Sequence, residues 1–274
     1  MKNSYFTLIT GASEGLGKFF ALECAARKMN LILVSLSGTG LAALSSFIER
    51  NFNVTVIYIE TDLSYITSCE MLKSEIESRH LRINMLINNA GLGSTSLFEE
   101  QSAEFYDKQI RLNVISTTLL TRSLISNLTQ SAPSHILNVG SLASFFHLPA
   151  KQVYGGTKAY IYAFSKSLHK EFSKKGVKVS VLCPGGINTN LRVTLYNRSM
   201  PWLAKLSVMN PEDVARIALT GLLSGKKVII PGSINNIFRM INRIVPEYLE
   251  NLIVGERLKD KNSKHTRIAP ALAN

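Results

Sequence analysis

The sequence is short of cysteine, of long apolar runs and of flexible linkers, and each shortage excludes a class of protein. None of its apolar runs approaches the roughly 18 residues that a membrane-spanning helix needs, and its N-terminal residues include no signal-peptide hydrophobic region or cleavage site. Its three cysteines, Cys24, Cys69 and Cys183, are far apart and lack the spacing of a metal site. We therefore expect a cytoplasmic protein with reduced, buried thiols and no bound metal.

Acidic residues are also scarce, and the resulting net charge of +12 is unevenly placed. Residues 165–205 hold eight Lys or Arg against one Glu, and residues 226–274 hold nine against four acids. A basic C-terminal third permits contact with an anionic substrate, an acidic carrier protein or a membrane surface. The alternative is a solvated face that only keeps the protein soluble. The sequence shows no nucleic-acid-binding motif, so nucleic acid is not an expected partner.

The chain does contain a regular alternation of short apolar segments and longer helical patterns. The predicted strands cover residues 5–9, 31–35, 54–60, 85–88, 135–139, 178–182 and 228–231. The predicted helices cover residues 15–28, 40–51, 66–79, 103–128, 153–175 and 211–224. Near-continuous apolar strands separated by helices are typical of a parallel sheet covered on both faces. The fold class is therefore α/β, and we expect one domain, residues 1–258, because no Pro-, Gly- or Ser-rich linker divides it.

Three later segments fall outside this alternation. Residues 187–210 are strongly apolar and long for a connection between a strand and a helix. Residues 259–274 are polar and aperiodic, which predicts disorder. Between them an apolar stripe at helical spacing comprises Ile237, Phe238, Ile241, Ile244 and Val245, with Arg239 and Arg243 off that face. We expect the stripe to pack on the sheet or at a subunit interface; docking on an acidic acyl carrier or an anionic membrane is the alternative.

A glycine cluster directly follows the first predicted strand. Residues 10–17 read TGASEGLG and lead into an apolar helix. Glycines at this place let the backbone turn sharply and approach a pyrophosphate, and the helix N-terminus supplies free N–H groups and a positive dipole end. The position between strand and helix therefore predicts a dinucleotide-binding loop rather than an ordinary tight turn.

A second chemical pattern opens the helix after the fifth predicted strand. Tyr154 and Lys158 are four residues apart and share one helical face. An ammonium group near a phenol favours the ionised form and lowers a pKa that is about 10 in water. The pair is therefore a candidate proton donor and acceptor for a carbonyl or alcohol, although the same spacing also occurs on ordinary solvated helices.

Taken in order, the motifs resemble the short-chain dehydrogenase/reductase family over residues 7–189. The glycine spacing G-x-x-x-G-x-G is that of the family, as are NNAG at 88–91, RLNV at 111–114, YGGTK at 154–158 and CPGGINT at 183–189. Ser141 precedes Tyr154 by 13 residues and follows Asn113 by 28, the separations usual in the family. Glu14 and Gly156 depart from the commoner residues, but neither is a proton-transfer group.

The resemblance implies a fold, an activity and a set of site residues. The fold is a Rossmann-type, doubly wound, seven-stranded parallel sheet, and the activity is hydride transfer between a nicotinamide cofactor and a carbonyl or alcohol carbon. Tyr154 is the implied general acid/base, Lys158 its pKa-lowering and ribose-binding partner, Ser141 the group that polarises the substrate, and Asn113 the support of a proton relay. The implied cofactor residues are Thr10, Gly11, Ser13, Gly15, Leu16, Gly17, Ser35, Ser37, Asp62, Leu63, Asn89, Ala90, Gly91, Tyr154, Lys158, Pro184, Gly185, Ile187 and Thr189.

The end of the second strand favours NADP(H) over NAD(H). NAD enzymes place a carboxylate there to hold the ribose 2′-OH, whereas residues 34–40 read VSLSGTG. Ser35, Ser37 and Thr39 offer hydroxyls to a 2′-phosphate and Lys18 is near in sequence, while the missing arginine and the carboxylate of Glu14 argue the other way.

The substrate is less determined than the cofactor. In the family, the segment at 187–210 is the substrate lid, and its apolar character favours a ketone with an apolar or acyl chain, free or linked to an acyl carrier or CoA. Packing on the core is the simpler explanation of that character. The alternatives are an NAD-dependent dehydrogenase of a small alcohol and a non-catalytic cofactor-binding module. The resemblance also implies a homodimer or homotetramer.

Overall fold

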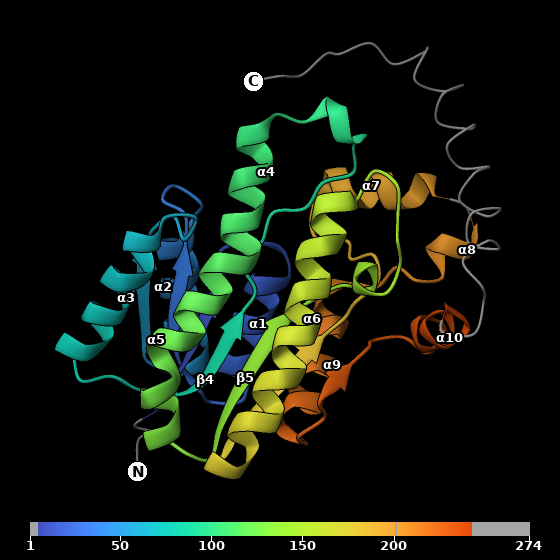
Figure 1. Ribbon diagram of the computed structural model, residues 1–274. Helices are drawn as coiled ribbons and strands as arrows, with labels where there is room; N and C mark the ends of the chain where they lie inside the picture. The colour runs from blue at the N-terminus through green and yellow to red at the C-terminus, as the bar shows by residue number, and fades with distance from the viewer. Residues whose placement is uncertain (1–4, 201, 243–274) are drawn as a thin grey trace.

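The computed structural model describes residues 5–200 and 202–242. Seven parallel strands form one sheet in the order β3-β2-β1-β4-β5-β6-β7 (Figure 1). The strands are β1 (Tyr5–Thr10), β2 (Asn30–Ser35), β3 (Val56–Glu60), β4 (Arg82–Asn88), β5 (Ser134–Val139), β6 (Val177–Leu182) and β7 (Val228–Ile229). The strand order reverses between β1 and β4, which makes this the switch point where open α/β sheets bind ligands. The predicted doubly wound, seven-stranded sheet is confirmed.

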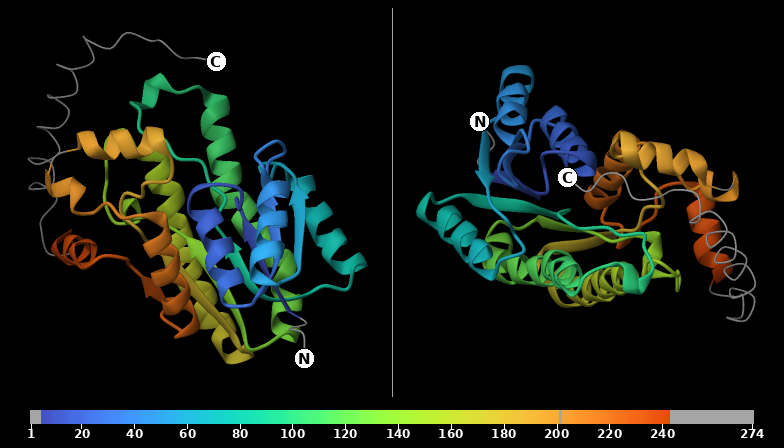
Figure 2. Two further views of the ribbon diagram at one scale, coloured as in Figure 1. Left: turned by 180° about the vertical axis from the view of Figure 1, so that it is seen from behind. Right: turned by 90° about the horizontal axis from the view of Figure 1, so that it is seen from above.

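Helices cover both faces of the sheet, as the view from above shows (Figure 2). One face carries α1 (Gly15–Ala26), α2 (Leu41–Phe52) and α9 (Pro211–Leu223). The other carries α3 (Ile66–Ser78), α5 (Thr117–Gln130) and α6 (Gln152–Phe172). The structure therefore has three layers with a separate apolar core on each side of the sheet.

The central strands supply both cores because successive side chains of a strand point to opposite faces. In β1, Ile9 packs with α1 and α9, whereas Leu8 packs with α3 and α5. In β2, Leu33 and Ile32 divide in the same way. All four side chains are fully buried. This burial on both faces explains why these strands read as continuous apolar runs in the sequence.

The helix predicted at 103–128 is interrupted where it passes the site. The structure has α4 (Ala103–Ile110), then a wider π-helical segment at Arg111–Ser116, then α5. Such single π turns occur mostly at functional positions. Asn113 lies inside this segment and is buried.

The C-terminal third departs most from the predicted alternation. Residues 187–210 contain α7 (Leu191–Ser199) and the short α8 (Trp202–Lys205), and α10 (Ser233–Asn242) follows the sheet. Strand β7 ends at Ile229, short of the predicted 228–231, and Pro231 has no N–H to extend the pairing. Ile244, Val245 and the tail at 259–274 lie outside the described residues. Among the residues described, no helix is long and apolar enough to span a bilayer.

Candidate active site

The glycine loop after β1 is shaped by two positions at which a side chain would not fit. Gly11 has φ +64°, a left-handed conformation that glycine adopts without strain. A Cβ on Gly17 would lie 1.9 Å from the carbonyl oxygen of Gly11. Helix α1 begins at Gly15, and its N-cap residue Glu14 makes no capping hydrogen bond through its side chain. The first turn of α1, which includes the buried Leu16, therefore leaves its N–H groups available to an anion.

The end of β4 is bonded directly to this loop. Asn89 donates from Nδ2 to the carbonyl oxygens of Thr10 at 2.9 Å and Gly11 at 3.1 Å. The hydroxyl of Thr10 accepts from the backbone N–H groups of Asn89 and Ala90, each at 3.0 Å. Thr10 is buried, so its hydroxyl serves to hold β1 and β4 at the switch point.

The end of β2 carries hydroxyl groups and no acid. The Oγ atoms of Ser13 and Ser35 are 2.7 Å apart, which joins the glycine loop to β2. Thr39 donates to the carbonyl oxygen of Leu36 at 2.7 Å. The side chains of Leu36 and Ser37 are exposed beside them.

Asp62 and Leu63 follow β3 on the same side of the switch point. Asp62 accepts hydrogen bonds from the backbone N–H of Ser64 at 2.9 Å and from Nζ of Lys108 at 3.1 Å. Partial burial opposes ionisation of Asp62, but these hydrogen bonds outweigh it and lower the pKa of its carboxyl. Leu63 is buried in the core.

Tyr154, Ser141 and Lys158 lie together where β5 ends and α6 begins. Ser141 follows β5, and its Oγ accepts from the backbone N–H of Ala143 at 3.1 Å. The Ser141 side chain also lies near enough to the phenol of Tyr154 to lower its pKa. Nζ of Lys158 lies 5.7 Å from the centroid of the Tyr154 ring and donates to the carbonyl oxygen of Val139 at 2.8 Å. The structure therefore brings the predicted acid/base group, its hydroxyl partner and its cation to one point.

Asn113 connects this cluster to the end of β4. Its Oδ1 accepts from the backbone N–H of Leu92 at 2.7 Å, and its Nδ2 donates to the carbonyl oxygen of Leu92 and to Oγ1 of Thr157. Thr157 in turn donates to the carbonyl oxygen of Tyr154 at 2.7 Å. A Cβ on Gly91 would lie 3.1 Å from Oδ1 of Asn113 and 3.4 Å from Nζ of Lys158. Gly91 therefore lies between the side chains of Asn113 and Lys158.

Burial sets the proton affinities of the two titratable groups. It raises the pKa of the Tyr154 phenol, and the Ser141 side chain acts in the opposite direction. It lowers the pKa of Lys158 from 10.5 to about 8. The sequence predicts a lowered pKa for Tyr154, but in the structure the net direction is upward because desolvation of a phenolate outweighs the effect of Ser141.

Lys151 is a second cation beside Tyr154 that the motifs did not predict. Its Nζ lies 5.3 Å from the centroid of the Tyr154 ring and donates to Oγ1 of Thr95 at 2.9 Å and to the carbonyl oxygen of Ser94. The three-residue spacing between Lys151 and Tyr154 was visible in the sequence. The contact with the loop after β4, however, joins residues 56 apart and required the tertiary structure.

The segment after β6 closes the opposite side of the site. The carbonyl oxygen of Pro184 accepts from the backbone N–H of Leu142 at 2.8 Å, so this segment is tied to the residue after Ser141. A Cβ on Gly185 would collide with Ser207. Ile187 pairs with Met209 in an isolated β-bridge. Thr189 reaches back to the glycine loop, since a Cβ on Gly15 would lie 3.2 Å from the Cβ of Thr189.

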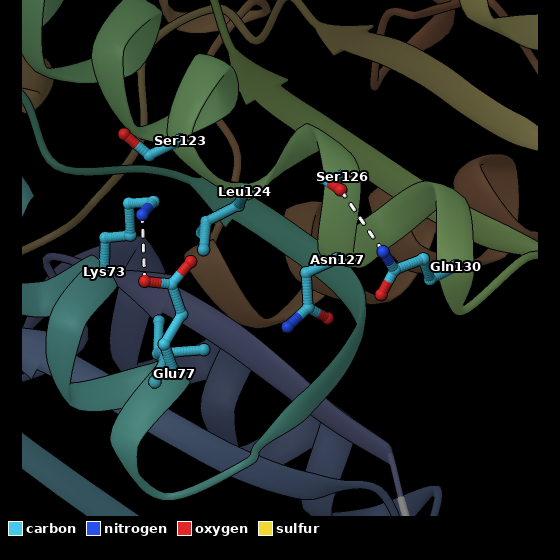
Figure 3. Close-up of a pocket in the computed structure, with 8 residues that line it drawn as sticks. Lys73, Glu77, Ser123, Leu124, Ser126, Asn127 and Gln130 are labelled. Carbon is cyan, nitrogen blue, oxygen red and sulfur yellow. Dashed lines mark hydrogen bonds and ion pairs between the residues drawn. The ribbon is translucent and has the colours of Figure 1, made fainter.

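A pocket of about 170 Å³ elsewhere in the molecule holds none of these residues (Figure 3). It lies between α3 and α5, where Lys73 and Glu77 form an exposed ion pair at 2.8 Å. Asn127 in its wall accepts from the backbone N–H of Ile83 and donates to the carbonyl oxygen of Leu81. Both partners lie at the N-terminal end of β4, whereas ligands of open α/β sheets bind at the C-terminal ends. We do not assign this pocket to the reaction.

Comparison with known proteins agrees with this geometry. The family profile described as short chain dehydrogenase matches residues 6–199, from β1 to the end of α7. This chain belongs to the short-chain dehydrogenase/reductase family. The sequence motifs predict an NAD(P)-dependent oxidoreductase, and the family match agrees with that prediction.

Relatives with reported activities are similar at about 30% identity. The very-long-chain 3-oxoacyl-CoA reductase of Rattus norvegicus is 31% identical over 192 residues, which are 68% of this chain but only 60% of that longer protein. The 3-oxoacyl-(acyl-carrier-protein) reductase of Buchnera aphidicola is 28% identical over 230 residues, 82% of this chain and 92% of that protein. A short-chain dehydrogenase from Sphingobium yanoikuyae, solved in complex with NADPH, is 26% identical with a TM-score of 0.75 over 98% of both chains.

The residues of this short-chain dehydrogenase fit a nicotinamide dinucleotide. Because Gly17 has no Cβ, the backbone of the glycine loop can lie close to the N-terminus of α1. Binding of a pyrophosphate requires this close approach. Thr189, in the segment after β6, lies against the same loop. Between them, the carboxyl ends of β1 and β4 present backbone and amide groups rather than bulky side chains.

Proposed function

We propose that this enzyme is an NADPH-dependent carbonyl reductase that acts on an apolar or acyl-chain ketone, with Tyr154 as the general acid. The observation that carries the proposal is the cluster of Tyr154, Ser141 and Lys158 at the C-terminal edge of the sheet. A bound nicotinamide cofactor would supply the hydride. The glycine loop and Thr189 would hold it, as the preceding geometry indicates.

The proton affinities favour reduction over oxidation. Because burial raises the pKa of Tyr154, its phenol keeps its proton at neutral pH and can donate it to a carbonyl oxygen. Ser141 would hold that oxygen with its own hydroxyl. Lys158 has a pKa of about 8, so it is mostly protonated at pH 7 and stabilises the phenolate that remains after donation. Asn113 and Thr157 fix the backbone around Lys158 by the hydrogen bonds described above.

The choice of NADPH rests on the charge of the β2 end. The hydroxyls of Ser13, Ser35 and Thr39 are grouped there, and no carboxylate stands in residues 34–40 to repel a 2′-phosphate. The similar short-chain dehydrogenase from Sphingobium yanoikuyae, solved with NADPH, supports the same choice.

The choice of an acyl-chain ketone rests on the substrates that the relatives' names state. Both similar reductases above act on 3-oxoacyl groups, one linked to CoA and one to an acyl carrier protein. A thioester-linked 3-oxoacyl chain is therefore the substrate class that we propose.

A substitution at Tyr154 tests the mechanism. Tyr154→Phe keeps the ring but removes the proton donor, so we expect kcat for a 3-oxoacyl thioester or model ketone to fall by about 10²–10⁴-fold. NADPH affinity, measured by fluorescence titration, should change little because the phenol contributes little to holding the cofactor. Tyr160→Phe is the matched control, since Tyr160 is exposed on the same helix and bonds only to Thr118 among the described residues.

Two results would contradict the proposal. A Tyr154→Phe enzyme that retains more than about a tenth of the wild-type kcat would remove Tyr154 from its role. Stoichiometric NADPH binding by the wild type with no turnover of any ketone in a broad panel would favour a non-catalytic cofactor-binding protein.

A further inference from the structure

Large apolar side chains are exposed on three helices at one end of the molecule. On α7 these are Leu191 at 75% exposure and Leu195 and Tyr196 at lower values, on α8 Trp202 at 73%, and on α10 Met240 at 66%. Figures 1 and 2 show α7, α8 and α10 together at the end opposite α3. We call the outward faces of these three helices the α7–α8–α10 surface. Exposed apolar side chains gathered in this way mark an interaction site more often than a solvated face.

Hydrogen bonds on the inner sides of the helices show that these side chains point away from the body. On α7, Asn197 is buried and donates to the carbonyl oxygen of Ile187, and Leu195 lies two residues away on the opposite side of the helix. On α10, Asn235 is fully buried and donates to the carbonyl oxygens of Pro231 and Ser207. The bond to Ser207 also joins α10 to the segment directly after α8, so the helices form one continuous surface.

The structure describes two side chains of the apolar stripe on α10, those of Ile237 and Phe238. Ile237 is 49% exposed, so it does not pack fully on the sheet, and packing of the stripe at a subunit interface stays a prediction. Arg239, expected away from the body, places its guanidinium 5.3 Å from the centroid of the Phe145 ring. The cations of the surface are therefore on α7 and α8 rather than on α10.

The surface is basic and has no acid in its sequence segments. Arg192 and Arg198 on α7 and Lys205 on α8 are exposed among the apolar side chains. No Asp or Glu occurs from residue 187 to 211 or from 228 to 246. Large apolar side chains interleaved with Lys and Arg, with Trp and Tyr among them, are typical of helices that lie in the headgroup region of a membrane.

We propose that the α7–α8–α10 surface docks this enzyme on an anionic lipid bilayer. A second copy of the chain is a poor occupant, because a two-fold contact would place the same uncompensated cations against each other. An anionic bilayer neutralises the cations and accepts protruding apolar side chains without a preformed groove. This inference goes beyond the proposed reductase activity and does not depend on it.

The chain contains its own probe for this docking. Trp202 is the only tryptophan in the sequence and lies on the surface itself. When full-length protein meets vesicles of phosphatidylcholine with about a third phosphatidylserine at low salt, we expect its emission to shift to shorter wavelength. The shift should be absent with pure phosphatidylcholine and should weaken at about 0.5 M salt, because exposed charge attraction is screened.

Paired variants identify the surface by flotation with the same vesicles. Arg192→Glu with Lys205→Glu should weaken binding by at least 20-fold, since each cation near an anionic surface contributes roughly a five-fold factor. Leu191→Ser with Trp202→Ser should also reduce binding. Lys226→Glu with Lys227→Glu is the matched control, because it changes the net charge equally at exposed residues that precede β7. Circular dichroism and thermal unfolding confirm that each variant folds.

Several results would overturn the proposal. Wild-type protein that neither floats nor shifts its emission with anionic vesicles at low salt excludes docking. Equal losses in the Lys226/Lys227 control and in the Arg192/Lys205 variant would mean that net charge alone, and not this surface, binds lipid. An emission shift caused by an acidic carrier protein but not by vesicles would assign the surface to a protein partner. A changed oligomeric state in the Leu191/Trp202 variant with unchanged vesicle binding would assign it to a subunit interface.

Discussion

Lys158 is buried, and burial disfavours the charged form of its ammonium group. The residue is 5% exposed, and burial lowers its pKa to about 8, while the carbonyl oxygen of Val139 accepts one hydrogen bond from Nζ. A group with such a depressed pKa binds fewer protons in the folded chain than in the unfolded chain between pH 8 and 10.5. The proposed catalytic charge is therefore held at a cost in stability.

This cost predicts a pH-dependent effect of Lys158→Met. Below about pH 8 the wild type bears the full penalty, and the penalty disappears as the pH rises toward 10.5, so wild-type stability gains relative to the variant across that window. We expect the difference in unfolding free energy between variant and wild type to shift by about 3 kcal/mol between pH 8 and 10.5. Urea unfolding at several pH values measures it. A difference that stays constant with pH would show that Lys158 is not perturbed.

Leu36 is the position at which the predicted preference for NADPH can be tested. Its side chain is 46% exposed directly after β2, beside the hydroxyls of Ser35 and Ser37. Leu36→Asp places a carboxylate there, which should lower kcat/KM with NADPH by at least about ten-fold through repulsion of the 2′-phosphate, with kcat/KM for NADH kept or raised. Leu36→Asn controls for the loss of the apolar side chain. A wild-type enzyme that prefers NADH would refute the assignment of NADPH.

At the scale of elements, α1 depends on one close backbone approach. Because a Cβ on Gly17 would lie 1.9 Å from the carbonyl oxygen of Gly11, Gly17→Ala forces α1 and the glycine loop apart. We expect a loss of stability of about 1–3 kcal/mol and a large loss of NADPH affinity, measured by thermal unfolding and by titration. Gly156→Ala is the control, since a Cβ there meets no atom within 4 Å and Ala stabilises a helix interior by up to about 1 kcal/mol. Equal effects of the two changes would argue against the close approach.

Comparison of the predicted and observed elements shows which of them the sequence pattern predicts. The sequence predicts β1, β2, α1, α2, α3 and α9 to within about two residues at each end. Strands buried on both faces appear as continuous apolar runs, and helices buried on one face appear as apolar residues at helical spacing. The π segment at Arg111–Ser116 left no such pattern. It follows from the bonds of Asn113 to Leu92 and Thr157, which are contacts between distant parts of the chain. On α10 the polar Asn235 is buried, which the apolar stripe in the sequence does not indicate.

The candidate site was more predictable than its electrostatics. Motif spacing predicted that Ser141 follows the fifth strand and that Tyr154 and Lys158 lie on the next helix, and the structure places them there, at the carboxyl edge of the sheet. The upward direction of the pKa of Tyr154 and the position of Lys151 depend on burial and on the loop after β4. The catalytic roles and the cofactor preference stay predictions until the variants above are measured.

At the scale of the whole molecule, charge and apolar surface are combined in one region. The basic excess of residues 165–205 was ambiguous in the sequence between a solvated face and a binding surface. In the structure, three of these basic residues, Arg192, Arg198 and Lys205, lie among exposed apolar side chains, which favours a binding surface over a solvated face. An enzyme that takes long acyl chains and docks on a bilayer would meet its substrate where such chains accumulate.

The strand order has a consequence for the order in which the chain is made. Strand β1 pairs with β2, about 25 residues later, but its other neighbour, β4, begins only at Arg82. During synthesis from the N-terminus, a sheet of β3, β2 and β1 would leave the edge of β1 uncovered until β4 emerges. An unpaired apolar edge is a template for pairing with another chain. We therefore expect a nascent chain that ends before Arg82 to aggregate more readily than one that includes β4.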